Sequence, residues 1–312
     1  MSTPSTLPKR RFCSASAARH WLCRSPRNRK FPMLVRLAFA AALMGAAPVL
    51  SATCPAPGQW IDSAGTAVSA QAALDKALSA QSILLGERHA TPSHHQWQAD
   101  SIAALAAKGP VVIGLEQLPR EAQPVLDRWV AGELDEAALQ TESKWADRWG
   151  HDFAAYRPVF LLARDKHIPM KALNVDRSFV RKVGREGFDK AAADGKSPIS
   201  KPAPAAPAYA AKLEETFRQH MREASPAAVA RFIDAQQVWD RAMAEAIVTA
   251  LRDHPGARVA AIMGWGHVAD GHGVAHQLKA LGAPLVLTAI PVKPGEGCEP
   301  AAGAADLLFG AE

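Results

Sequence analysis

The chain has 312 residues, of which 48% are hydrophobic and 21% charged, which suits one large globular domain or two small ones with a buried core. All nine Lys and Arg of residues 1–52 stand in a stretch without Asp or Glu, and removing them from the total of 36 leaves 27 bases against 30 acids. The remainder is mildly acidic, so the formal charge of +6 gives no support for nucleic-acid binding.

Residues 1–52 have the pattern of an export segment. A basic leader precedes an apolar run that begins near Met33 and ends in small residues at Ser51 and Ala52. The run is too short to span a bilayer and is typical of a secretory signal peptide, whereas the alternative is an apolar N-terminal helix. We expect Met33 to be the true start and residues 1–32 to be an upstream segment.

Two cysteines, Cys54 and Cys298, follow the leader. Cys54 comes directly after the apolar run, as in a bacterial lipoprotein, but Ser51 and Thr53 occupy positions where Leu and a smaller residue are expected, so lipidation stays open. Export favours a disulfide between Cys54 and Cys298, which would join the two ends of the mature chain; two free thiols are the alternative.

Short apolar runs alternate with longer amphipathic segments from residue 71 onward, which is typical of parallel strands joined by helical crossovers. The predicted strands cover residues 82–87, 111–116, 168–174, 258–264 and 284–290. The predicted helices cover residues 69–79, 93–107, 119–131, 152–166, 209–222, 226–252 and 273–281. We therefore predict an α/β domain over residues 53–312, with a mostly parallel central sheet flanked by helices and a helical cap subdomain of helices at about 188–252.

Polar residues follow three of these strands, in GERH, GLEQ and GWGH. A glycine can turn each chain sharply, so that His89 and His267 point back across the strand ends, where ligands bind in parallel sheets. With Glu116 they would suit zinc, manganese or cobalt, and Glu87 could orient a water or a histidine. Alternatively, both histidines bond loop backbone and Glu116 caps the following helix.

Four further histidines lie near predicted helix starts. His94 and His95 are expected to be solvated, whereas His272 and His276 stand four residues apart and could share a ligand on one helix face. His272 is the better candidate because it lies nearer the strand end.

The stretches LLGERH, VVIGLE, YRPVFLLARDKHIPMKALNVDR and MGWGHVADGHGVAHQL resemble the ChaN-type haem-binding uptake proteins, which are grouped with the Tiki metalloproteases and related to erythromycin esterase-like proteins. The resemblance runs from about residue 82 to 290. It implies haem at the interface of a homodimer, with a tyrosine on the iron and a partner histidine nearby. Tyr156, inside the matching stretch, would be the axial ligand, and Arg157 or Arg177 would meet the propionates; alternatively Tyr156 packs on the core.

Three functions remain open. The resemblance implies an exported haem-binding protein in the periplasm or at the outer-membrane periphery of a Gram-negative bacterium, where an outer-membrane haem or iron uptake system would be its partner. His89, His267 and His272 would surround the haem, with apolar walls from Trp149, Phe153, Phe160 and Trp265. The alternative is a metal-dependent hydrolase, a Tiki-like peptidase or esterase, that uses Glu87, His89, Glu116 and His267. A partner-binding protein with a degenerate pocket is a third reading.

Overall fold

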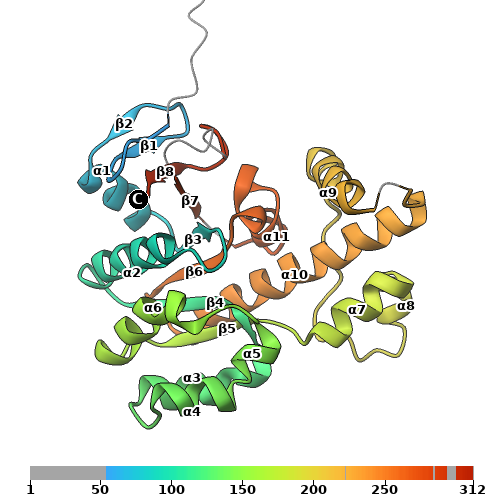
Figure 1. Ribbon diagram of the computed structural model, residues 1–312, viewed down its shortest axis with the longest axis horizontal. Helices are drawn as coiled ribbons and strands as arrows, with labels where there is room; N and C mark the ends of the chain where they lie inside the picture. The colour runs from blue at the N-terminus through green and yellow to red at the C-terminus, as the bar shows by residue number, and fades with distance from the viewer. Residues whose placement is uncertain (1–53, 222, 284, 294–299, 312) are drawn as a thin grey trace, which may run out of the picture. The chain divides into compact units, whose positions relative to one another are not determined.

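The structure is a computed structural model that describes residues 54–221, 223–283, 285–293 and 300–311 (Figure 1). Residues 1–53, with Met33, lie outside the described residues. Cys54 is disulfide-bonded, while its predicted partner Cys298 also lies outside them, so this pairing stays a prediction.

Eight strands form one sheet in the order β2-β1-β8-β7-β3-β6-β4-β5. The strands are β1 (Trp60–Asp62), β2 (Ala67–Val68), β3 (Ser82–Glu87), β4 (Val111–Pro119), β5 (Met170–Asn174), β6 (Arg258–Gly264), β7 (Val286–Val292) and β8 (Leu307–Gly310). Among the strands of the described residues, β1 alone pairs in antiparallel fashion, with β2 and β8. The predicted mostly parallel α/β fold is therefore confirmed.

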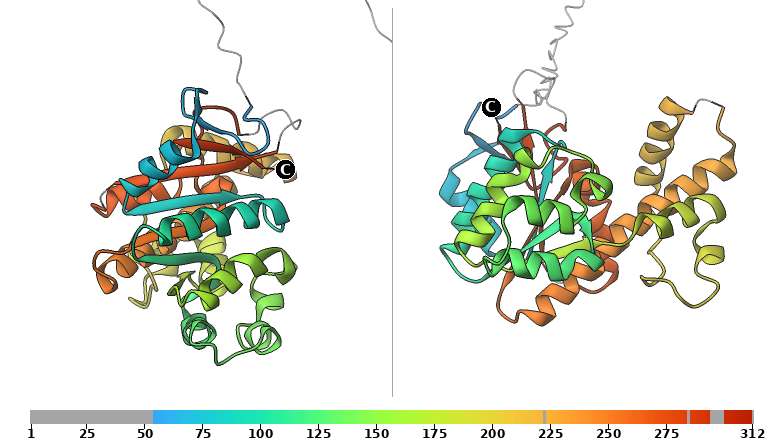
Figure 2. Two further views of the ribbon diagram at one scale, coloured as in Figure 1. Left: turned by 90° about the vertical axis from the view of Figure 1, so that its left-hand side faces the viewer. Right: turned by 60° about the horizontal axis from the view of Figure 1, so that its bottom comes forward.

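Helices cover both faces of this sheet (Figure 2). They are α1 (Ala70–Leu78), α2 (Pro92–Ala106), α3 (Gln123–Val130), α4 (Glu136–Glu142), α5 (Trp145–Arg148), α6 (Phe153–Asp165), α7 (Arg177–Glu186), α8 (Phe188–Ala191), α9 (Pro207–His220), α10 (Pro226–Asp253) and α11 (Val274–Ala280). Helix starts follow the capping rule: the side chains of Ser69, Asp152 and Ser225 accept from backbone N–H groups of the first turns of α1, α6 and α10.

Side-chain alternation along the strands divides the interior into two main cores. Ile83 and Leu85 on β3 pack with α1, α2, α3 and α6, whereas Leu84 points to the other face and packs with α10 and α11. Because both faces are covered, the strands are apolar throughout. Within the described residues no helix is long and apolar enough to cross a membrane.

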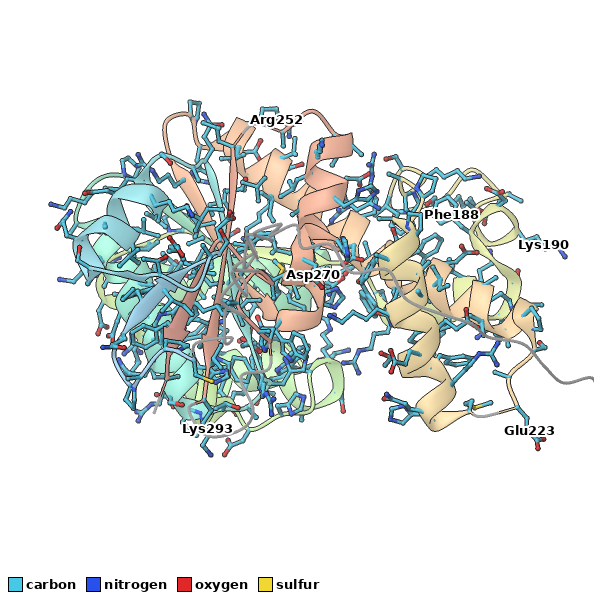
Figure 3. All side chains as sticks on the ribbon, turned by 90° about the horizontal axis from the view of Figure 1, so that it is seen from above. Phe188, Lys190, Glu223, Arg252, Asp270 and Lys293 are labelled. Atoms are coloured by element: carbon cyan, nitrogen blue, oxygen red, sulfur yellow. The ribbon has the colours of Figure 1, made fainter. Side chains whose placement is uncertain are left out.

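A third, smaller core joins α7, α8 and the first half of α10, which with α9 we call the cap helices. Figure 3 shows Lys190 and Glu223 on the side of these helices away from the sheet, and Asp270 between them and the sheet. Nζ of Lys212 on α9 donates to Asp270 at 3.1 Å. The cap helices therefore contact the loop that follows β6.

Candidate functional site

Three functional positions share the carboxyl edge of the sheet because β6 lies between β3 and β4. Glu87 at the end of β3 pairs with Gly264 at the end of β6, and Glu116 follows the last residue of β4 that pairs with β6. The backbone N–H of Gly264 donates to Oε2 of Glu116 at 2.6 Å. Since parallel strands end at one edge, the sheet itself assembles this group.

A buried carboxylate orients the first imidazole. Nδ1–H of His89 donates to Oε1 of Glu87 at 2.9 Å, and Glu87 is 1% exposed. The same carboxylate accepts from the Tyr156 hydroxyl at 3.0 Å and from Nε2 of Gln98 at 3.2 Å. Burial acts to raise the pKa of Glu87, but the hydrogen bond from His89 and nearby positive charge hold it below its usual value. His89 is thus fixed while its side chain remains 36% exposed.

Two carboxylates hold the second imidazole. Nδ1–H of His267 donates to Oδ1 of Asp240 on α10 at 2.6 Å, and Nε2 lies 3.5 Å from Oε1 of Glu116. Asp240 is fully buried and also accepts from the Tyr209 hydroxyl at 3.1 Å. Burial acts to lower the pKa of His267, but the charges of Asp240 and Glu116 overcome it and raise the pKa to about 9. His267 is therefore an imidazolium at neutral pH.

The two imidazoles and Glu116 meet around Gly264. A Cβ at Gly264 would stand 2.7 Å from Cε1 of His89, 3.0 Å from its Nε2 and 3.7 Å from Oε2 of Glu116. Burial acts to lower the pKa of His89, but its hydrogen bond to Glu87 and the charge of Glu116 raise it above the usual value. The structure thus brings His89, Glu116 and His267 together, as the strand-end pattern predicts, and the glycine gives them room.

These groups do not form an open set of metal ligands. His267 directs both nitrogens at carboxylates, and Glu116 already accepts from the Gly264 N–H. Among the residues that the structure describes, no group of three or more His, Cys, Asp or Glu side chains is placed to hold one metal ion. The donor set as it stands does not fit zinc, manganese or cobalt.

Tyr156, the predicted iron ligand, belongs to the core. Its side chain is 0% exposed, and its hydroxyl donates to Glu87 and accepts from the Ala90 N–H at 3.2 Å. Burial raises its pKa, which disfavours the phenolate that would bind iron. Tyr209 is also buried, at 4% exposure, and is bonded to Asp240. Both tyrosines are thus buried and hydrogen-bonded to carboxylates in this conformation, and tyrosine ligation stays a prediction.

Two other predicted cofactor contacts have partners of their own. Arg157 is 55% exposed and pairs with Glu136. His272 is half-buried, with its ring 5.8 Å from that of Tyr209 near the cap helices. Their roles stay predictions.

The prediction that His94 and His95 are solvated is wrong, since they are 2% and 0% exposed. The loop after β3 folds back over the start of α2, so that the Arg88 N–H donates to Nδ1 of His94 at 3.0 Å. His95 donates to Oε1 of Gln98 at 2.9 Å, and its ring lies 3.9 Å from that of Tyr156. Both histidines are therefore buried residues that contact the loop and the tyrosine next to His89.

A cleft of about 490 Å³ lies beside the site, at the carboxyl ends of β4 and β5. His267 forms part of its wall, whereas His89 is not among the lining residues; the His89 ring packs edge-on, at 4.7 Å, against Trp149, which is. Basic side chains are unusually frequent in its lining: Lys144, Arg148, Arg177 and Arg181. The predicted propionate ligand Arg177 therefore does lie in a cleft at this edge.

Two residues of the site were not predicted from the ends of the strands. Asp240 orients His267 from the middle of α10. In the sequence it is an acid on a helix face that is otherwise apolar, because Met243 and Ile247 follow it at spacings of three and seven residues. Gln117 lines the cleft and is 2% exposed. It belongs to the polar stretch GLEQ, but the sequence assigns it no role beside Glu116, because on a regular strand the next residue points to the opposite face.

We predict that Gly264→Ala displaces the His89 ring, because a Cβ cannot stand 2.7 Å from its Cε1. The hydrogen bond to Glu87 would break, and the pKa of His89 would fall, as followed by NMR titration of the imidazole. Gly266→Ala is the matched control, since a Cβ there meets no atom within 4 Å. An unaltered His89 titration in Gly264→Ala would contradict this geometry.

We also predict that stability falls as pH rises through the range in which His267 titrates. Its folded pKa of about 9 exceeds the ordinary value of 6.5, so its ion pairs stabilise the fold fully below about pH 6.5 and are lost as pH passes 9. The free energy of unfolding in urea should drop by on the order of 3 kcal/mol over this range. His267→Gln, although less stable, should lack this decline; an equal decline in both proteins would disprove the assignment.

A comparison with solved structures finds the fold of this chain in ChaN of Campylobacter jejuni. ChaN of Campylobacter jejuni, described as binding haem cofacially, is 16% identical, with a TM-score of 0.64 over 81% of this chain and 96% of that one. An erythromycin esterase mutant in its open conformation is 10% identical, with a TM-score of 0.44 over 76% of this chain and 77% of that one. The comparison with curated proteins gives no match.

The sequence profile of one family matches residues 73–278, which is well over half of the chain and includes the strand ends and both histidine turns. That family is described as haem-binding uptake, Tiki superfamily, ChaN. The resemblance seen in the sequence motifs is therefore confirmed, and the chain belongs to the ChaN family of haem-binding uptake proteins in the Tiki superfamily.

Proposed function

We propose that this protein binds haem for uptake, with His89 on the iron in place of the tyrosine that the resemblance implied. The observation that carries the proposal is the state of the His89 ring. Its Nδ1 is fixed by a buried carboxylate, its side chain is 36% exposed, and its Nε2 forms no hydrogen bond within the described part of the chain. A carboxylate that accepts a hydrogen bond from one ring nitrogen orients the imidazole and makes the other nitrogen a stronger ligand for metals.

The choice of site follows from ligand chemistry as well as shape. A more apolar cavity of about 540 Å³ lies between α1, α2 and the sheet, with Trp60, Trp97 and Phe309 in its walls. Its described lining contains no His, Tyr, Cys or Met, the side chains that hold haem iron. The cleft beside His89 combines an imidazole, the Trp149 ring and several cations, which fit the iron, one porphyrin face and the propionates.

The proposal includes a homodimer that forms on haem binding. The cleft has few apolar residues besides Trp149 and Trp239, so one chain would leave much of a porphyrin in water. A second copy would cover the open face. We further propose export to the periplasm or outer-membrane periphery, next to a haem or iron uptake system, which the disulfide at Cys54 supports because such bonds persist in oxidising compartments.

Titration with ferric haem tests the iron ligand. Wild-type protein should give a saturable Soret band, and His89→Ala should shift that band and weaken binding by roughly tenfold or more, since it removes a coordinate bond. Tyr156→Phe should keep the wild-type band. His254→Ala, which changes a histidine at the opposite ends of the strands, is the matched control. Loss of the band in Tyr156→Phe, with His89→Ala unaffected, would restore tyrosine ligation.

A second candidate is hydrolysis of an ester or peptide by general acid–base catalysis. It is favoured by one observation: each imidazole is held by a buried carboxylate, so that His89 could accept a proton while the imidazolium of His267 donates one. If this activity exists, His89→Ala and Glu116→Gln should each lower the turnover of an activated aryl ester by about 10²–10⁴-fold. Turnover equal in these variants and the wild type would remove this candidate.

A further inference from the structure

Gln117 is a buried amide without a partner. Its side chain is 2% exposed, and neither its Nε2 nor its Oε1 forms a hydrogen bond within the described residues. Leaving both ends of a buried amide unpaired costs the desolvation of each polar group, so native proteins rarely do so without a reason. Gln117 also lines the basic cleft beside His267.

A bulge in β4 places this amide there. The register between β4 and β5 shifts between Leu115 and Pro119, so the residues between them leave the regular ladder. On a regular strand Glu116 and Gln117 would point to opposite faces, yet both line the cleft. Bulges commonly redirect side chains beside functional sites, and this one brings a second polar group to the same wall.

The cleft carries an excess of positive charge. Glu116 is matched by His267 at 3.5 Å, and the remaining acids of the lining are Asp147 and Asp176. Four bases, Lys144, Arg148, Arg177 and Arg181, stand against these two acids, while the imidazolium of His267 is shared between Glu116 and the buried Asp240. Positive charge is therefore in excess around the cleft, which suits an anionic ligand.

We propose that Gln117, Arg177 and Arg181 form a carboxylate-binding site that recognises the propionate edge of haem; this rests on the proposed function. An arginine donates paired N–H groups to a carboxylate, and the amide N–H₂ of Gln117 adds a third donor direction. The negative propionates match the excess of positive charge, and the ligand satisfies the unpaired amide. Gln117 is thus a specificity-determining residue, whereas His89 holds the iron.

The test compares ferric haem with ferric haem dimethyl ester, which keeps the iron and the porphyrin faces but lacks both charges. Full-length wild type should bind haem more tightly than the ester. Gln117→Leu should weaken haem binding roughly tenfold to hundredfold and leave ester binding unchanged. It should also keep or raise the melting temperature, because the substitution removes an unsatisfied buried amide; a merely structural glutamine would lower it.

Arg181→Gln, at an exposed position on α7, should reproduce the loss of haem affinity even if Gln117→Leu folds poorly. Gln96→Leu, an exposed glutamine on α2, is the control. Equal affinity of the wild type for haem and its ester, or unchanged haem binding in Gln117→Leu and Arg181→Gln, would overturn this inference and leave the proposed function standing. Binding of neither compound by the wild type would overturn both.

Discussion

The buried carboxylate of Glu87 is the constraint on which the site depends. A charge that is 1% exposed must be matched within the fold, and Glu87 is matched by His89, Tyr156 and Gln98. Because Gln98 belongs to α2 and Tyr156 to α6, one carboxylate joins both helices to the end of β3 while it orients the imidazole. The accessible histidine is therefore positioned by the core, although it lies on a loop.

Much of the sheet could be predicted because strands buried on both faces are written as continuous apolar runs. β3 and β6 have the predicted bounds, and the alternation of strands and helices indicated that these strands run parallel. The strands β1, β2 and β8 were missed. They contain three, two and four residues, too few for any periodic pattern, and they pair only because distant segments meet at the sheet edge.

The site could be predicted in part, for a related reason. The ends of strands are visible in the sequence, so the meeting of His89, Glu116 and His267 could be foreseen. Their helical partners could not, because whether a polar residue on a helix is solvated or buried depends on what packs against it. The hydroxyl of Tyr156 donates a hydrogen bond to a carboxylate 69 residues away, and no local sequence pattern indicates that partner.

The two carboxylate–imidazole pairs are chemically alike, yet they are placed for different tasks. His267 is 14% exposed and has both nitrogens engaged, so freeing its Nε2 would cost the ion pair with Glu116. His89 is more than twice as exposed and has one nitrogen engaged. Glu116 thus pairs with the imidazole of His267, whereas Nε2 of His89 stays available to a ligand. Under the proposed function, a chain with one available imidazole would supply one bond to the iron and would cover one face of the planar ligand. The asymmetry of the site would therefore favour association of two chains after the ligand has bound rather than before.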